Sequence, residues 1–132
     1  MARERSRRYG AFARHLIRTE PVLEYIKNSQ VRIAFLASDQ EMIKNGRYVF
    51  GQCEKVPSKY SWIVPYDFTI TVFEPNVERF TTEQIRILML HELLHIGIDI
   101  DGNEEQYRIV PHDIEEFNTI INRYGMDWSE EG

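Results

Sequence analysis

The stretch ILMLHELLHIGIDIDG, residues 87–102, places two histidines and a glutamate inside one of the most apolar runs of the chain. Burying an imidazole or a carboxylate without a partner costs free energy, and the carboxylate costs more. His91 and His95 are four residues apart, so on a helix their rings share one face and can converge on one metal ion. Glu92 is offset by one residue, which predicts a carboxylate beside the metal that can accept a proton from water. Zinc suits this combination of residues.

The residues before the motif carry the signals of a buried helix. Thr81 followed by Gln84 is a capping box, which predicts the helix start. Apolar residues then surround the helix axis almost completely, as expected of a helix buried within its domain. Gly97 is expected to end the helix, and residues 99–109 are expected to form a polar loop. If His91 and His95 were ordinary core histidines bonded to carbonyls, this apolar helix would be unexplained.

Catalytic zinc sites of this kind use a third protein ligand. We favour His112, an imidazole at the start of the next predicted helix. Glu115 or Glu116, and Asp101 or Asp113, stay open as alternatives. Asp113 and Glu116 also suit a different role, which is to orient a metal ligand through a hydrogen bond.

The rest of the chain predicts helices packed on one small sheet. Alternating or β-branched apolar residues predict three strands, at 31–38, about 47–54 and 66–75. Asn45-Gly46 is a turn signal before the second of these strands. Three further helices are expected at 9–17, 21–28 and 111–125. This order predicts an α+β fold in which a small mixed or antiparallel sheet packs against the buried motif helix and flanking helices.

Composition sets the broad class of the protein. The chain has 132 residues, of which 42% are hydrophobic and 28% charged, so we expect one domain spanning residues 1–132. It shows neither a run long enough to cross a bilayer nor a secretion signal, so we expect no membrane contact and a cytoplasmic location in a bacterial host cell. The single cysteine, Cys53, excludes an intramolecular disulfide and a multi-cysteine zinc cluster, and it fits a reducing compartment.

Charge is distributed unevenly along the chain. The net charge is −5, but residues 1–18 contain six arginines and one acid, a balance of +5 that leaves −10 on the rest. This basic N-terminal arm and helix, residues 1–20, has two open interpretations. One is a solvated helix start, and the other is contact with nucleic acid through four of its arginines: Arg3, Arg5, Arg7 and Arg8.

Three segments, HELLHIG, VPHDIEEF and RYGMDW, together resemble the putative phage metallopeptidase domains, small zincin-like proteins of bacteriophages and prophages. The resemblance covers most of the chain, from RIAFLAS through YDFTITV to YGMDW. It implies a minimal zincin fold and a peptidase, with His91, His95 and His112 as metal ligands and Glu92 as catalytic base. The chain is also similar in outline to SprT-like proteases, which act on DNA-bound proteins, but it lacks their cysteine-based zinc-binding module.

The leading hypothesis is a zinc-dependent metallopeptidase that hydrolyses a protein or peptide substrate with a zinc-activated water and Glu92 as general base. Either Tyr107 or Tyr124 is a candidate to stabilise the oxyanion, although ordinary packing is the favoured interpretation of both. An edge strand beside the motif helix is expected to pair with an extended substrate. The alternative is a zinc-binding protein-interaction module with little turnover, associated with nucleic acid through the basic N-terminus.

Overall fold

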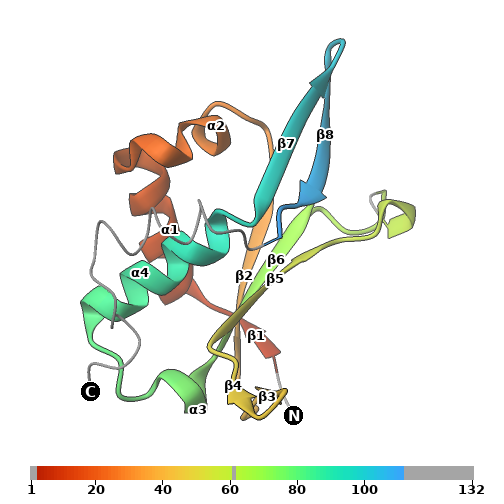
Figure 1. The fold of residues 1–132 in the computed structure, drawn as a ribbon. Helices are drawn as coiled ribbons and strands as arrows, with labels where there is room; N and C mark the ends of the chain where they lie inside the picture. The colour runs from red at the N-terminus through yellow and green to blue at the C-terminus, as the bar shows by residue number, and fades with distance from the viewer. Residues whose placement is uncertain (1–2, 61, 112–132) are drawn as a thin grey trace.

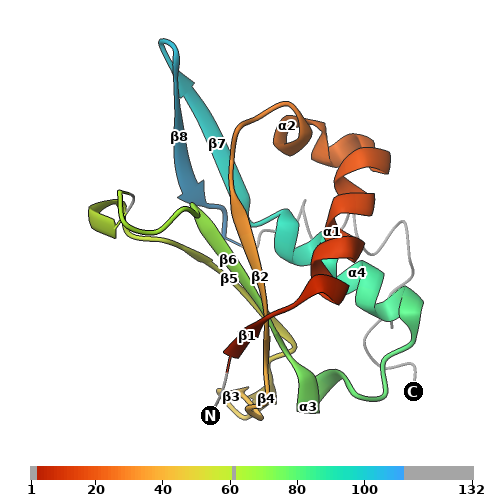
Figure 2. The same cartoon turned by 180° about the vertical axis from the view of Figure 1, so that it is seen from behind.

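The computed structural model describes residues 3–60 and 62–111 of the chain (Figure 1). A four-stranded sheet forms its centre, and helices cover one face of that sheet (Figures 1 and 2). The strands of this sheet are β1 (Arg3–Arg5), β2 (Ile33–Ser38), β5 (Gly51–Lys55) and β6 (Phe68–Phe73). The helices are α1 (Arg7–Thr19), α2 (Glu24–Lys27), α3 (Glu74–Val77) and α4 (Thr82–Leu93), with short 3-10 turns η1 (Pro21–Leu23) and η2 (Ser58–Tyr60).

The sheet is mixed, with the order β1-β2-β6-β5. Its two central strands, β2 and β6, are parallel, while β1 and β5 run antiparallel to their neighbours at the two edges. Phe68, Ile70 and Val72 of β6 are completely buried beneath the helices. The strands are shorter than the sequence predicts, but the predicted α+β class, a small mixed sheet packed against the motif helix, is confirmed.

Helix α4 begins where the sequence predicts. The hydroxyl of Thr81 accepts a hydrogen bond from the Gln84 backbone N–H at 3.1 Å, and the Gln84 side chain accepts one from the Thr81 N–H at 2.8 Å. This reciprocal pair satisfies two of the donors that a helix start leaves open. The apolar residues that follow are buried between α1 and the sheet, so α4 is the buried helix that the pattern predicts.

The segment after α4 corrects the sequence analysis. The helix ends at Leu93, and residues 99–109 form a hairpin rather than a polar loop, with strands β7 (Ile96–Asp101) and β8 (Glu104–Ile109). Gly97 is not a helix stop. It lies within β7, where an added Cβ would approach Val110 and Arg108 to 2.9 Å, so the close approach of these segments requires glycine. The alternation of isoleucines from Ile96 onward is a strand pattern that explains the difference.

Two hairpins of the described residues are closed by tight turns. Gly102 has φ +66° at the first position of the β7–β8 turn, as a type II′ turn requires. Asn45 and Gly46, with φ +54° and +75°, connect β3 (Ile43–Lys44) to β4 (Arg47–Tyr48). The predicted turn at Asn45-Gly46 is therefore confirmed, whereas the single strand predicted at 47–54 is divided between β4 and β5.

The basic N-terminal segment is part of the fold. Arg3, Glu4 and Arg5 form the edge strand β1, which continues directly into α1 (Figure 2). The Ser6 hydroxyl caps α1 by accepting a hydrogen bond from the Tyr9 N–H at 3.2 Å. None of the helices found between residues 3 and 111 has the length and apolar character needed to cross a membrane. The helix predicted at 111–125 lies outside the described residues, apart from its first position.

Candidate metal centre

His91, Glu92 and His95 come together at the C-terminal end of α4. One potential ligand atom from each residue lies within 4.8 Å of the other two. The two imidazole rings are 5.2 Å apart between centroids and nearly perpendicular, at 86°. His91 and Glu92 belong to the last turn of the helix, and His95 follows its C-cap. Two imidazoles and a carboxylate at this separation form a donor set that zinc accepts.

The β7–β8 hairpin holds the ring of His95 in place. The Val110 carbonyl lies 2.6 Å from Nδ1 of His95, and the Val110 N–H donates to the His95 carbonyl at 2.7 Å. A carbonyl can only accept a hydrogen bond, so Nδ1 carries the proton. In the neutral ring Nε2 is then the basic nitrogen, which is the form that ligates a metal. Val110 therefore acts through His95, fixing the orientation and tautomer of its ring.

Glu92 is almost completely buried, with an exposed fraction of 5%. Its neighbour across the sheet edge is Gly51 of β5, where an added Cβ would lie 3.2 Å from the Glu92 Cγ and 3.3 Å from its Oε2. The absence of a side chain at Gly51 thus makes room for the carboxylate. Burial disfavours the ionised form and raises the pKa of Glu92 to about 8.

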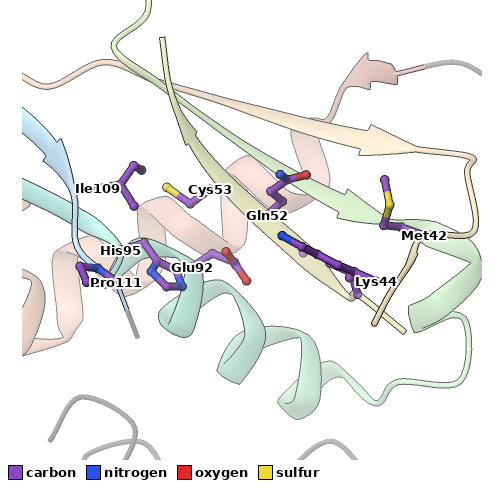
Figure 3. Close-up of a pocket in the computed structure, with 10 residues that line it drawn as sticks. Met42, Lys44, Gln52, Cys53, Glu92, His95, Ile109 and Pro111 are labelled. Carbon is purple, nitrogen blue, oxygen red and sulfur yellow. The ribbon is translucent and has the colours of Figure 1, made fainter. Parts of the chain in front are cut away.

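The surroundings of the Glu92 carboxylate fit a bound cation. Within residues 3–60 and 62–111, no hydrogen bond to this side chain is found, and Glu92 lines a cavity beside the histidines. The carboxylate points into a cavity of about 430 Å³ (Figure 3). A metal held by the adjacent imidazoles would favour its ionised form.

The cavity lies between the end of α4, strand β5 and the β3–β4 hairpin (Figure 3). Its lining comprises Met42, Lys44, Val49, Gly51, Gln52, Cys53, Glu92, His95, Ile109 and Pro111. Burial, and secondarily the nearby Glu92, raise the pKa of the Cys53 thiol, so Cys53 is protonated at neutral pH. The groups that converge at the end of α4 are His91, Glu92 and His95, and Cys53 contributes part of the cavity wall.

The remaining predicted site residues are only partly covered by the structure. His112, Asp113, Glu115, Glu116 and Tyr124 lie outside the described residues, so their roles stay predictions. The roles of His91 and His95 as ligands, and of Glu92 as base, also stay predictions, although the structure brings the three residues together.

Asp101 and Tyr107 lie away from the histidines. Asp101 is exposed at the tip of the β7–β8 hairpin, beyond a strand that rises about 3.3 Å per residue. The Tyr107 hydroxyl donates to the Glu105 carboxylate at 2.6 Å, and its ring packs edge-on against Phe68. Neither residue lines the cavity that contains Glu92.

Sequence reasoning missed Gly51, Val110 and Cys53. Each reaches the site through strand pairing or chain reversal over a long sequence separation, which spacing along the chain does not reveal. The one available signal was the alternation of residues 96–100, which predicts a strand and hence a hairpin returning to the motif.

Comparison of the chain with known protein families identifies the family to which it belongs. The family model described as putative phage metallopeptidase matches residues 1–131, so the chain belongs to this family, as the resemblance implies. Neither the curated proteins nor the solved structures contain a match to it.

Proposed function

We propose that this member of the putative phage metallopeptidase family is a zinc-dependent peptidase whose active site is the cavity beside α4. The observation that carries the proposal is the Glu92 carboxylate. It is buried, it lacks a hydrogen-bond partner among the described residues, and it points into a cavity next to two histidines. A metal site with a purely structural role would not require a base at this position.

Each residue has a defined role in the proposed reaction. His91 and His95 hold the zinc, with His112 as the proposed third ligand and Asp113 and Glu116 as groups that orient ligands. When bound, zinc supplies a Lewis acid that polarises the substrate carbonyl and makes water at the site more acidic. Glu92 accepts the proton of the attacking water and passes it to the leaving amine.

Strand β5 supports a peptide as the substrate. It forms one edge of the four-stranded sheet, and within the described residues its outer side has no strand partner. Gly51, Gln52 and Cys53 of this strand also line the cavity. An extended peptide that adds to the sheet along β5 would bring its backbone past Glu92, and main-chain hydrogen bonds would hold it there. This edge strand is the one that the sequence alone did not identify.

The test compares Glu92→Gln with the wild type on unfolded and DNA-associated protein substrates. The amide has nearly the shape of the carboxylate but no basic oxygen. We expect zinc content to be retained and cleavage to fall by about 10²–10⁴, the contribution of a general base. Glu83→Gln is the matched control, because Glu83 is an exposed residue of the first turn of α4. Equal cleavage by zinc-loaded wild type and Glu92→Gln would remove Glu92 from the mechanism.

A second candidate is a zinc-binding protein-interaction module with little turnover. The connection between β5 and β6 favours it, because the side chains of Trp62 and Ile63 are 83% and 62% exposed there. Exposed apolar side chains that lie together often mark an interaction surface. This candidate replaces the peptidase if no substrate is cleaved by the zinc-loaded wild type above the level of Glu92→Gln.

The bacterial cytoplasm is the compartment we propose. Cys53 is the only cysteine of the chain, and its thiol is free in the structure. A chain without disulfides fits a reducing environment.

A further inference from the structure

A second polar cavity lies at the opposite edge of the sheet from Glu92. Its volume is about 390 Å³, and it is bounded by β1, the first turns of α1 and strand β2. Three arginines, Arg5, Arg7 and Arg14, surround it, and Ile33 and Phe35 form an apolar part of its wall. We call it the arginine pocket. Its lining contains no acidic side chain, so it concentrates positive charge on a chain whose net charge is −5.

The arginines of the pocket differ from the other arginines of the N-terminal segment. Arg3 pairs with Glu54 at 3.4 Å, and the Arg8 guanidinium lies over the rings of Tyr9 and Phe12. In the part of the chain that the structure describes, no carboxylate pairs with an arginine of the pocket. The charges of these three arginines are therefore not neutralised by a carboxylate of the described residues.

The one acidic residue among residues 1–18 lies outside the pocket. Glu4 lines a different cavity, together with Asp39 and Glu74.

Two of the three guanidinium groups are positioned by specific packing. The Arg5 guanidinium lies 5.0 Å from the ring centroid of Tyr66, a cation–π contact that orients it while its charge is kept. Arg14 extends back along α1 over Gly10, where an added Cβ would lie 3.1 Å from its Nη1 and 3.5 Å from Phe35. A glycine inside a helix costs about 0.5–1 kcal/mol relative to alanine, and here it provides the space that Arg14 occupies.

The chemistry of the pocket selects its ligand. Guanidinium groups match phosphate with paired, charge-assisted hydrogen bonds, and three around one cavity favour a phosphate group. A nucleic acid presents such phosphates in series, and Arg18 continues the positive charge along α1. The remaining residues carry a net charge of −10, so the N-terminal segment is the part of the sequence that attracts a polyanion.

We infer that the arginine pocket binds the phosphate backbone of nucleic acid through Arg5, Arg7 and Arg14. This revises the contact set predicted from the sequence, in which Arg3 and Arg8 were included and Arg14 was not. The inference is independent of the peptidase proposal, because the two cavities share no lining residue.

Binding of a labelled DNA oligonucleotide, followed by fluorescence anisotropy between about 50 and 200 mM salt, tests the inference. We expect Arg14→Gln to weaken binding several-fold and to flatten the plot of log affinity against log salt by roughly 0.7–0.9, the value for one phosphate contact. Arg8→Gln removes the same charge from the same helix but does not line the pocket. It should stay within about twofold of the wild type, since a screened charge outside the contact adds little.

Gly10→Ala narrows the pocket without changing the charge of the chain, and alanine suits a helix. The added Cβ would lie 3.1 Å from the Arg14 Nη1, so the guanidinium would shift by a few tenths of an ångström. We expect Gly10→Ala to weaken DNA binding less than Arg14→Gln does, because the charge is retained. Equal losses of DNA binding in Arg14→Gln and Arg8→Gln would show that the pocket is not the binding site.

Two further outcomes would show that nucleic acid is not the ligand. If the wild type binds no DNA at low salt but binds inorganic phosphate, the pocket is a small-anion site. If polyglutamate binds as tightly as DNA and depends equally on Arg14, the partner is an acidic protein. Competition between DNA and millimolar inorganic phosphate at the same site, lost in Arg14→Gln, would support the inference.

Discussion

The two edges of the central sheet carry opposite kinds of polar site. At the β5 edge, Glu92 and His95 are buried, and the carboxylate has lost most of its contact with water. At the β1 edge, Arg5, Arg7 and Arg14 are exposed and keep their hydration. Burial makes electrostatic interactions strong and insensitive to salt, whereas exposure makes them weak and easily screened. We therefore expect single changes at the β5 edge to have large effects, and changes at the β1 edge to have small, salt-dependent ones.

The largest expected effect at the β5 edge is a dependence of the free energy of unfolding on pH in the metal-free protein. The pKa of Glu92 rises from 4.5 to about 8 on folding. Between these values the folded state keeps a proton that the unfolded state releases, so the free energy of unfolding falls as pH rises. The loss, on the order of a few kcal/mol at about 1.4 kcal/mol per pKa unit, is complete above pH 8.

Urea unfolding from pH 5 to 8 measures this effect. Glu92→Gln should show a flatter dependence than the wild type, because its amide does not titrate. Added zinc should flatten the wild-type curve, since a cation favours the ionised carboxylate. Parallel curves for the two metal-free proteins would show that Glu92 is not desolvated as the structure indicates.

Gly51→Val tests how closely β5 packs on the buried carboxylate. Even a Cβ at this position would meet Glu92 and the Thr71 carbonyl, 3.3 Å away, and the carbonyl belongs to the neighbouring strand and cannot rotate aside. We expect a loss of about 1–3 kcal/mol in the free energy of unfolding, as for other overpacked sites. Gly51→Ala should lose less. A valine variant as stable as the wild type would mean that the contact is loose.

Arg14→Gln should have the smallest effect on the folded protein. Arg14 is exposed and has no carboxylate partner in residues 3–60 and 62–111, so unfolding free energy should change by less than about 0.5 kcal/mol. Zinc content and peptide cleavage should equal those of the wild type. A loss of zinc or of peptide cleavage in Arg14→Gln would show that the two edges of the sheet are coupled, which would contradict their independence.

The sequence predicts the parts of the molecule that depend on local spacing. The Thr81–Gln84 cap, the buried helix and the turn at Asn45-Gly46 each need only a few consecutive residues, and each is present. The four-residue spacing also predicts the approach of His91 and His95, although His95 lies just past the C-cap of α4 and its ring is oriented by Val110. The sequence predicts that α4 ends at Gly97, whereas it ends at Leu93. Gly97 can end a helix or permit a close strand contact, and local sequence does not distinguish the two.

Features that depend on chain pairing could not be read from the sequence. Gly51 meets Glu92 because β5 lies antiparallel to β6, and Val110 reaches His95 because the hairpin returns. The charged residues of β1 do not resemble a strand, yet they pair with β2. Arg14 could have been found, since residues 7, 10 and 14 recur at helical spacing on one face of α1.

Zinc content after equilibrium dialysis, measured by elemental analysis, tests the central claim that the end of α4 is a metal site. We compare the wild type with His95→Ala and with the matched control His15→Ala, which removes an exposed histidine of α1. The account predicts one zinc per chain in the wild type and in His15→Ala, and a large loss in His95→Ala, because the site then lacks an imidazole ligand. Full occupancy in His95→Ala, or no zinc in the wild type, would contradict it.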